Sequence, residues 1–341
     1  MINLSKKKIH FDIKKPLRKY LINYEREVAM PVAYSDLVRY HNSFPLYDHR
    51  GDDTFWVSVI YPQTDFEAIN EGLKKTYATL KAHRDLSLIE HLYVDRIDLC
   101  VYGNTQPFRV RVVNKINDNY DYFYVKKADA SRIYGLELEH LLSPNRINFY
   151  VDGQTLIEEH IAGIPGDMFI KHNLNDPRLN KIRLAKEFVK FNERCFVRLL
   201  GDMHSGNYVI EITPDFEEVH YRIRAIDFDQ QSYDGRKLVY MPQYYKNNNA
   251  IINIGLELLT PESVKQYQEE ERSLIANRLR AAKYRIKELG DAVMYDEISL
   301  PQNTEQLKRE LAKHYNDDEF LNCTGMGSVV RTSLRMLLNR V

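Results

Sequence analysis

Three residues of this sequence could together carry out chemistry on a phosphate group: Asp202, Asn207 and Asp227. Asp202 and Asn207 are five positions apart, and Asp227 follows on a second apolar run. The same Asp–Asn separation occurs in the phosphoryl-transfer loop H-R-D-x-x-x-x-N. Carboxylate and amide oxygens are the ligands that Mg²⁺ prefers, and a carboxylate beside a hydroxyl can accept its proton. The pattern therefore predicts phosphoryl transfer that depends on ATP and Mg²⁺.

Each residue of this group has a predicted role. Asp202 is the candidate catalytic base, which orients an acceptor hydroxyl and takes its proton. Asn207 and Asp227 are candidate ligands of the Mg²⁺ that bridges the nucleotide phosphates. Asp229 is either a further metal ligand or a turn acid, and the pattern leaves both interpretations open. His204 is interpreted as a histidine that holds the loop rather than as an acid or base.

The elements around these residues make the pattern more specific than an Asp and an Asn in a loop, where both residue types are common. An amphipathic helix is predicted over residues 180–199, directly before the loop. Two short strands are predicted after it, at 208–212 and 219–226. A helix, a tight loop and a hairpin in that order would bring the three oxygen-bearing side chains to one point.

Two lysines at the end of a predicted strand, Lys126 and Lys127, are candidates for binding the nucleotide phosphates. Side chains alternate along a strand, so Lys127 shares a face with Val125 and Lys126 shares one with Tyr124. In kinases the residue two positions before the phosphate-binding lysine lies over the adenine ring. A valine fits there better than a tyrosine, so the pattern favours Lys127. Whichever lysine points outward would be an ordinary solvated side chain.

The phosphate-binding lysine would need an acidic partner. The helix predicted over residues 131–142 offers Glu137 and Glu139. Glu137 is favoured, because Leu141 lies four positions later on the same helix face and could pack that face inward. Either glutamate could instead be an ordinary surface residue.

Residues 156–163 are predicted to form a hinge strand whose backbone, between Glu159 and Ile161, hydrogen-bonds the adenine ring of ATP. The acids of this strand could equally be solvated loop residues. The loop that would cover the phosphates, at 103–107, contains a single glycine and no Gly-rich repeat. That loop is the weakest part of the nucleotide-binding pattern.

The order of the predicted elements indicates the fold class. Three strands, a helix and two strands are expected in succession between residues 92 and 160, and helices dominate the rest, one of them running from Thr260 to Gly290. This order predicts an α+β, two-lobed protein-kinase-like fold, with a small antiparallel-sheet N-lobe and a mostly helical C-lobe. The predicted boundaries are 1–90 for an N-terminal α/β extension, 91–162 for the N-lobe and 163–341 for the C-lobe.

These motifs resemble those of the aminoglycoside phosphotransferase and choline kinase branch of the protein-kinase-like superfamily. That branch carries H-G-D-x-H-x-x-N, and residues 200–207 match it except at the first position, which is Leu200. Its I-D-F-[DE] signature is similar to residues 226–229, and the turn that ends its hinge is similar to residues 161–168.

The resemblance implies for Asp202, Asn207 and Asp227 the roles that their spacing predicts. It also implies a phosphate-binding role for Lys126 or Lys127. No A-P-E sequence follows Asp227, which argues against a regulated protein kinase of the eukaryotic type.

The composition narrows the class of partner and the compartment. Lys+Arg and Asp+Glu are balanced at 48 each, so the net charge gives no sign of a nucleic-acid or membrane partner. No apolar run approaches the roughly 20 residues that span a bilayer. Three widely spaced cysteines, and an N-terminus without the apolar segment of a signal peptide, favour a cytoplasmic protein.

The predicted function is therefore an ATP- and Mg²⁺-dependent phosphotransferase that moves the γ-phosphate to a hydroxyl of a small molecule or sugar. The alternatives are an atypical Ser/Thr protein kinase of the effector or toxin type, whose acceptor is a protein substrate, and a pseudokinase scaffold. The three oxygen-bearing residues favour turnover, whereas the glycine-poor loop favours the scaffold.

Overall fold

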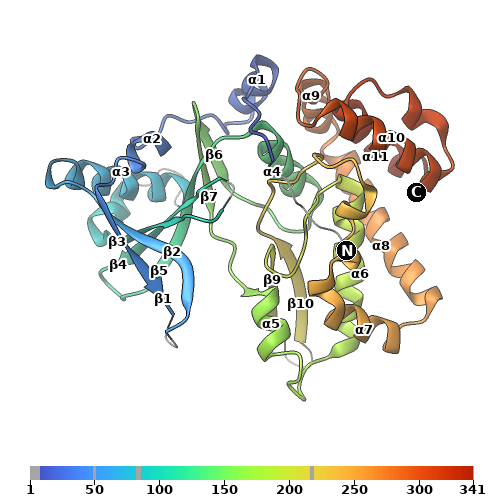
Figure 1. Ribbon diagram of the computed structural model, residues 1–341, viewed down its shortest axis with the longest axis horizontal. Coiled ribbons are helices and arrows are strands. Elements are labelled where there is room, and N and C mark those ends of the chain that lie inside the picture. Colours follow the sequence, from blue (N-terminus) through green and yellow to red (C-terminus); the bar gives the residue numbers. More distant parts are fainter. Residues whose placement is uncertain (1–7, 49–50, 82–85, 104, 216–218, 341) are drawn as a thin grey trace. The chain divides into compact units, whose positions relative to one another are not determined.

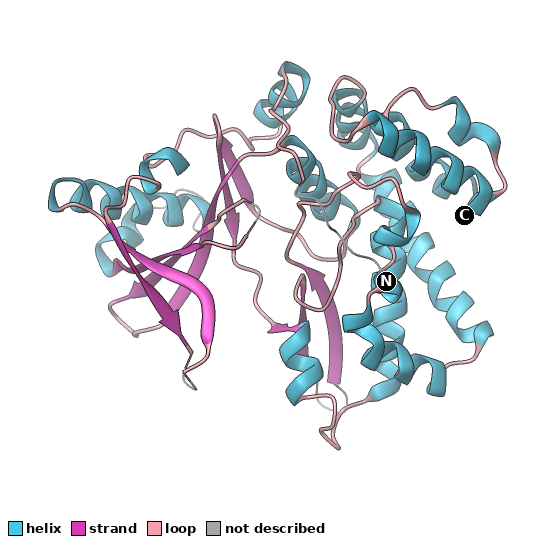
Figure 2. Cartoon of the chain, viewed as in Figure 1, coloured by secondary structure: helices cyan, strands magenta, loops and turns pink. Residues whose placement is uncertain are grey.

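The computed structural model of the chain describes residues 8–48, 51–81, 86–103, 105–215 and 219–340. These residues form two compact units. The sheet unit contains residues 18–129 and 147–160, and the helical unit contains residues 8–17, 130–146 and 161–340. Figure 2 shows that strands dominate the first unit and helices the second. Within the described residues, no helix has both the length and the apolar character needed to cross a membrane.

The sheet unit is built on a seven-stranded antiparallel sheet with the order β1-β2-β3-β4-β5-β7-β6. Its strands are β1 (Asn42–Tyr47), β2 (Asp53–Ile60), β3 (Leu92–Cys100), β4 (Phe108–Asn114), β5 (Tyr120–Lys127), β6 (Phe149–Asp152) and β7 (Thr155–Glu159). Its other elements are α2 (Tyr34–Leu37), α3 (Gln63–Lys81) and the 3₁₀ helix η1 (Leu86–His91), while α1 (Lys15–Asn23) spans the boundary between the units. The core joins Leu73 and Leu80 of α3 to Phe108, Phe123 and Val125 of the sheet.

The first two strands correct the predicted domain boundary at residue 90. Trp56 of β2 pairs with Cys100 of β3, and Val57 pairs with Leu99. The strands β1 and β2 are therefore part of the same sheet as β3 to β7, and they do not belong to a separate extension.

The helical unit is arranged around α6 (Lys181–Arg198), which packs against α7, α8, α11 and β10 (Figure 1). Its other helices are α4 (Ala130–Leu142), α5 (Gly166–His172), α7 (Asn249–Leu258), α8 (Pro261–Ala281), α9 (Lys283–Val293), α10 (Pro301–Tyr315) and α11 (Met326–Arg340). Four 3₁₀ helices are η2 (Lys237–Tyr240), η3 (Pro242–Tyr244), η4 (Lys246–Asn248) and η5 (Asp318–Asn322). A small sheet contains β8 (Ile164–Pro165), β9 (Tyr208–Pro214) and β10 (Val219–Ala225) in the order β10-β9-β8.

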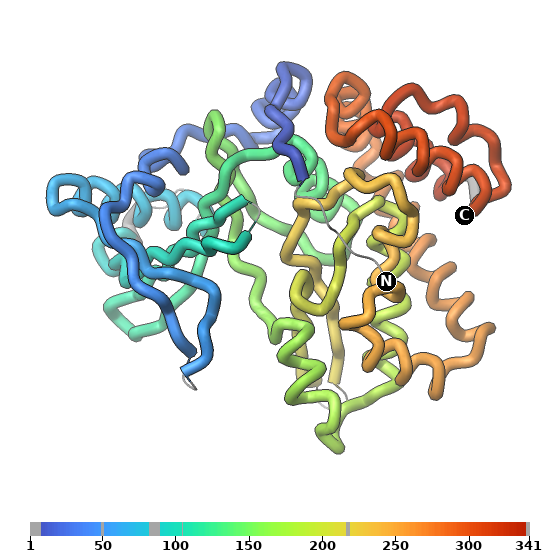
Figure 3. Tube along the Cα trace, viewed as in Figure 1, coloured from blue at the N-terminus to red at the C-terminus, as the bar shows by residue number. Residues whose placement is uncertain are grey.

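The fold class is as predicted in that the chain is α+β, with an antiparallel-sheet unit and a mostly helical unit. The segment from β3 to β7 runs strand, strand, strand, helix, strand, strand, and the colours of Figure 3 follow its path along the chain. The helix of this segment, α4, nevertheless belongs to the helical unit. The helix predicted from Thr260 to Gly290 is interrupted at Ala282, and after this break Arg285 of α9 reaches Glu137 of α4.

Arg–Glu pairs, each with a buried glutamate, link four helices of the helical unit. On α4, Glu139 pairs with Arg198 of α6, and Glu137 pairs with Arg285 of α9 at 2.8 Å. Between α6 and α8, the pairs are Arg194–Glu271 at 3.4 Å and Arg272–Glu193 at 2.6 Å. A charge inside a protein must be neutralised by a partner, so these pairs restrict how the helices can pack.

We expect Arg285→Met to lower the free energy of unfolding by about 3 kcal/mol, because it removes a counter-ion from the fully buried Glu137. Lys265→Met is the matched control. Its pair with Glu269 is exposed on both sides, so its loss should cost less than about 1 kcal/mol. Urea denaturation measures both changes, and equal losses in the two variants would contradict the prediction.

Candidate active site

The chain leaves α6 through a turn with two residues in left-handed conformation. Leu199 has a φ of 56° and Asp202 a φ of 62°, a region that non-glycine residues seldom adopt and that recurs at functional sites. The backbone N–H of Asp202 donates to the Tyr245 hydroxyl at 3.0 Å and to the Val239 carbonyl at 3.2 Å. These contacts hold the backbone of Asp202 in place, so its carboxyl group is presented from a fixed turn.

The side chain of Asn207 closes this loop. Its Nδ2 donates to the Asp202 carbonyl at 2.9 Å and lies 3.5 Å from Asp202 Oδ2. The Asn207 carbonyl accepts the N–H of Ile226 at 3.0 Å. Because Ile226 directly precedes Asp227, the loop is tied to the strand end that carries the next acid. The structure thus brings Asp202, Asn207 and Asp227 together within the helical unit.

Asp227 and Asp229 share a buried counter-ion, Arg132. Its Nη1 lies 2.8 Å from Asp227 Oδ1 and 2.5 Å from Asp229 Oδ1. The N–H of Asp229 also donates to Asp227 Oδ1, at 3.2 Å. Arg132 is fully buried, whereas the Asp227 side chain is 34% exposed. One guanidinium therefore offsets the charge of two neighbouring carboxylates, one of which is open to solvent.

Arg132 reaches these acids because α4 packs closely on the segment that carries them. The Ser131 hydroxyl donates to the Gln231 carbonyl at 2.8 Å. A Cβ atom at Gly135 would lie 3.1 Å from the Cβ atoms of Phe228 and Gln231, which is closer than ordinary van der Waals contact. A glycine at this position allows the close approach that places Arg132 beside Asp227.

The electrostatic surroundings of Asp202 suit proton transfer at neutral pH. Burial, together with the negative charges of Asp227, Asp229 and Asp234, raises the pKa of Asp202 to about 7. A carboxyl group with a pKa near the working pH can both accept and release a proton. Among the candidate residues, Asp202 therefore has the character that a general base requires.

His204 has contacts that fit the loop-holding interpretation. Its Nδ1 accepts the N–H of Gly206 at 3.1 Å. Burial lowers the pKa of its ring, which favours the neutral form at pH 7. A neutral ring that accepts a backbone N–H stabilises the turn between Asp202 and Asn207.

The oxygen donors of the site are suited to Mg²⁺. No group of three or more His, Cys, Asp or Glu side chains in the described part of the chain is placed to hold a metal ion. Mg²⁺, however, is usually held by one or two protein ligands together with substrate phosphates and water. The Asn207 amide oxygen accepts no hydrogen bond from a described residue, and Asp227 is partly open to solvent. Together they fit such a site.

Lys126, not Lys127, is the inward-facing lysine of β5. Lys126 is buried and Lys127 is exposed, so the preference for Lys127 was wrong. The alternation along the strand is as expected, but the face that carries Val125 packs into the core against α3. On the opposite face, Lys126 Nζ donates to Glu158 Oε2 at 2.9 Å and lies 5.3 Å from the Tyr124 ring.

The predicted pairing of a β5 lysine with Glu137 or Glu139 is also wrong. Both glutamates pair with arginines of their own unit, Glu137 with Arg285 and Glu139 with Arg198. The reason is that α4 belongs to the helical unit, where it packs against α8 and α9. Arg198 also holds the pKa of Glu139 below its usual value, although burial alone would raise that pKa.

Part of the predicted hinge already forms hydrogen bonds within the sheet unit. The N–H of Glu159 already donates to the Asn148 carbonyl at 3.1 Å, and its Oε1 accepts the N–H of Asn148 at 2.7 Å. The N–H of Glu159 is therefore not a free donor for adenine. Ile161 is buried and lies in the helical unit. Position 104, in the loop predicted to cover the phosphates, lies outside the described residues.

Arg132 is the candidate functional residue that the sequence analysis missed. A signal for it exists, because it lies among apolar residues, Ile133, Tyr134 and Leu136, in the first turns of a helix. All ten residues from 130 to 139 are buried. A charged residue on a helix that is covered on all sides requires a counter-ion, and acids elsewhere in the chain are the candidates.

Comparisons with known proteins add little to this geometry. No protein-family model matches the sequence, and no curated protein matches it. One solved structure that it resembles is described as titin kinase and its flanking domains, with 13% sequence identity and a TM-score of 0.29. The match covers 72% of this chain and spans 54% of that one. Similarity at this level supports no conclusion about activity or substrate.

The raised pKa of Asp202 predicts a pH-dependent effect of Asp202→Asn on stability. Between its usual pKa of about 3.9 and its raised value near 7, the folded state holds a proton that the unfolded state has lost. Stability therefore falls as the pH rises through this window and Asp202 ionises. The variant should be more stable than the natural protein by roughly 1–3 kcal/mol at pH 8, and by less at pH 5. Urea denaturation at the two pH values tests this, and an equal effect at both would contradict it.

Arg132→Met should lower the free energy of unfolding by about 3–5 kcal/mol, because it leaves two adjacent carboxylates without their shared counter-ion. Adding Asp229→Asn removes one of these charges. The double variant should therefore be more stable than Arg132→Met alone, as a double-mutant cycle would measure. Additive losses in the double variant would show that the ion pairs do not stabilise the fold.

Proposed function

We propose that this chain is an ATP- and Mg²⁺-dependent phosphotransferase that moves the γ-phosphate to a hydroxyl group of a small molecule or sugar. The observation that carries the proposal is the convergence of Asp202, Asn207 and Asp227 on one loop and one strand end. The motif-level resemblance to the aminoglycoside phosphotransferase and choline kinase branch supports the same assignment.

In this proposal Asp202 is the general base. It orients the acceptor hydroxyl and takes its proton as the oxygen attacks phosphorus. A pKa of about 7 suits this role better than the usual value of an aspartate, because a stronger base accepts the proton more readily. The contact between Asn207 Nδ2 and the Asp202 carbonyl keeps the base in position.

Asn207 and Asp227 would hold Mg²⁺, with Asp229 behind them in contact with Arg132. When bound, the ion supplies charge neutralisation for the phosphates and orients the γ-phosphate for in-line attack. The excess of acids at the site supports this assignment, because their charges add to burial in raising the pKa of Asp202, and a divalent cation would relieve their mutual repulsion.

Lys126 is the proposed phosphate-binding lysine. It is a compact charge at the end of β5 and is held by Glu158. Ile161 is the proposed backbone contact to adenine, whereas the N–H of Glu159 is already used in the sheet. We propose that the reaction takes place in the cytoplasm. The three free cysteines support this location, because a reducing compartment keeps thiols free.

A pseudokinase scaffold is the second candidate. Its support is Arg132, a fixed cation that already pairs with the two acids, Asp227 and Asp229, where a kinase would use a metal ion. An atypical protein kinase differs from the leading proposal only in its acceptor. Autophosphorylation after incubation with Mg²⁺ and ATP, detected by mass spectrometry, would favour it.

The variants Asp202→Asn and Asp227→Asn should distinguish the role of a general base from that of a metal ligand. Asp202→Asn should lower kcat by about 10²–10⁴-fold with little change in nucleotide affinity. Asp227→Asn should abolish turnover and also weaken nucleotide binding in the presence of Mg²⁺. ATP consumption with a panel of hydroxyl-bearing metabolites and a protein-substrate panel measures turnover, and calorimetry measures affinity.

Asp176→Asn is the matched control, because Asp176 is a partly exposed aspartate of the same unit that pairs with an arginine, Arg178. It should behave as the natural protein does. Mg²⁺-dependent turnover unchanged in Asp227→Asn would refute the metal assignment. Nucleotide binding without turnover in the natural protein would favour the scaffold. Absence of nucleotide binding would exclude both the phosphotransferase and a nucleotide-binding scaffold.

A further inference from the structure

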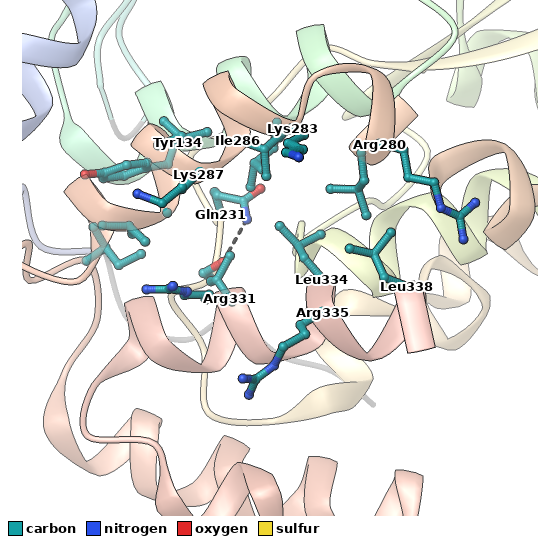
Figure 4. Close-up of a pocket in the computed structure, with 18 residues that line it drawn as sticks. Tyr134, Gln231, Arg280, Lys283, Ile286, Lys287, Arg331, Leu334, Arg335 and Leu338 are labelled. Atoms are coloured by element: carbon teal, nitrogen blue, oxygen red, sulfur yellow. Dashed lines mark hydrogen bonds between the residues drawn. The ribbon is translucent and has the colours of Figure 1, made fainter. Parts of the chain in front are cut away.

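The helical unit contains a second site candidate, an apolar cavity of about 340 Å³. Its wall is formed mainly by aliphatic side chains of α8, α9 and α11, namely Leu279, Ile286, Leu289, Val293, Leu334 and Leu338. Figure 4 shows Leu334 and Leu338 reaching from α11 toward Ile286 of α9. The volume lies within the range of small-molecule sites, which is about 300–1,000 Å³.

Positive charges surround this apolar wall. Lys287 and Arg331 share one acid, Asp291, at 2.9 and 3.4 Å. Arg280 and Lys283 also line the cavity, and within the described part of the chain neither forms an ion pair with a carboxylate. Arg280 donates only to the amide oxygen of Asn277, and Lys283 lies over the ring of Tyr284. The rim therefore carries a surplus of positive charge.

Most of the uncharged polar groups of the wall already form hydrogen bonds with the protein. The Gln231 side-chain N–H₂ group donates to the Arg198 carbonyl at 2.6 Å and to the Ser232 hydroxyl at 2.7 Å. The Tyr134 hydroxyl donates to Asp296 Oδ2 at 2.6 Å. A ligand that fits this cavity thus needs an apolar body and an anionic end, and few other polar groups.

We propose that this cavity binds a single-chain anionic amphiphile of the fatty-acid type. The alkyl chain would lie among the aliphatic side chains, and the carboxylate would pair with Arg280 and Lys283. An inorganic anion would leave the apolar wall exposed to water, and a neutral alkane would leave the cations without a partner. The site is distinct from the acid cluster around Asp202, and the inference does not depend on the proposed phosphotransferase activity.

Isothermal titration calorimetry of the full chain with octanoate, decanoate, decanol and decyltrimethylammonium tests the ligand class, at concentrations below micelle formation. Decanoate should bind at least about tenfold more tightly than decanol, and the cationic analogue should not bind. Each methylene added between octanoate and decanoate should tighten binding by up to about fourfold. Decanoate binding that is no tighter than decanol binding would overturn the proposal.

Gly290→Leu tests the location of the site. Gly290 lines the cavity within α9, and a Cβ atom there would meet no heavy atom within 4 Å. A leucine should fill the cavity without a clash, and it is also a better helix former than glycine. This variant should remain folded and lose decanoate binding. Wild-type affinity in a folded Gly290→Leu variant would place the ligand elsewhere and overturn the proposal.

The double variant Arg280→Gln/Lys283→Gln tests the charge. It should weaken decanoate binding by about tenfold or more and leave decanol binding unchanged. Arg309→Gln is the matched control, since Arg309 is exposed on α10 and does not line the cavity. Equal affinities for decanoate in the double variant and the control would also overturn the proposal.

Discussion

The acid cluster of the helical unit depends on one interaction, the pairing of buried Arg132 with Asp227 and Asp229. Carboxylates gathered on a loop and a strand end repel one another, and burial makes that repulsion costly. A guanidinium 2.5–2.8 Å from two of them reduces the cost while leaving Asp202 with a raised pKa. The acid cluster can therefore persist inside a folded protein and still retain a carboxyl group that is ready to exchange a proton near pH 7.

The helix α4 supplies this counter-ion, and its charges explain why it packs with helices. In the expected kinase-like arrangement, this helix offers an acid to a lysine of the sheet. Here it offers a cation, Arg132, to the acids Asp227 and Asp229, and its glutamates are held by arginines of α6 and α9. The charge that this helix contributes is thus opposite in sign to the expected one. Glu158, on the strand beside Lys126, takes the place of the helix glutamate as the partner of that lysine.

The apolar cavity and the acid cluster share their supporting elements. Tyr134 and Leu138, two and six residues after Arg132 on α4, line the cavity. Gln231 and Ser232, which follow Asp229 closely, line it as well. Two chemically different surfaces, one anionic and one apolar with a cationic rim, are therefore built on the same helix and the same loop. The close packing of Gly135 against Phe228 and Gln231 joins these elements.

The sequence by itself determined the local features of the site. A five-residue spacing is enough for the Asn207 amide to close the loop, because its hydrogen bond to the Asp202 carbonyl needs only a short local turn. Alternation along β5 likewise places Lys126 and Lys127 on opposite faces. Only the tertiary structure decided which face is covered by α3, which acid neutralises Lys126, and that Arg132 lies beside acids 95 and 97 residues away. Those contacts depend on how distant elements pack, and neither spacing nor periodicity encodes the identity of a partner so far along the chain.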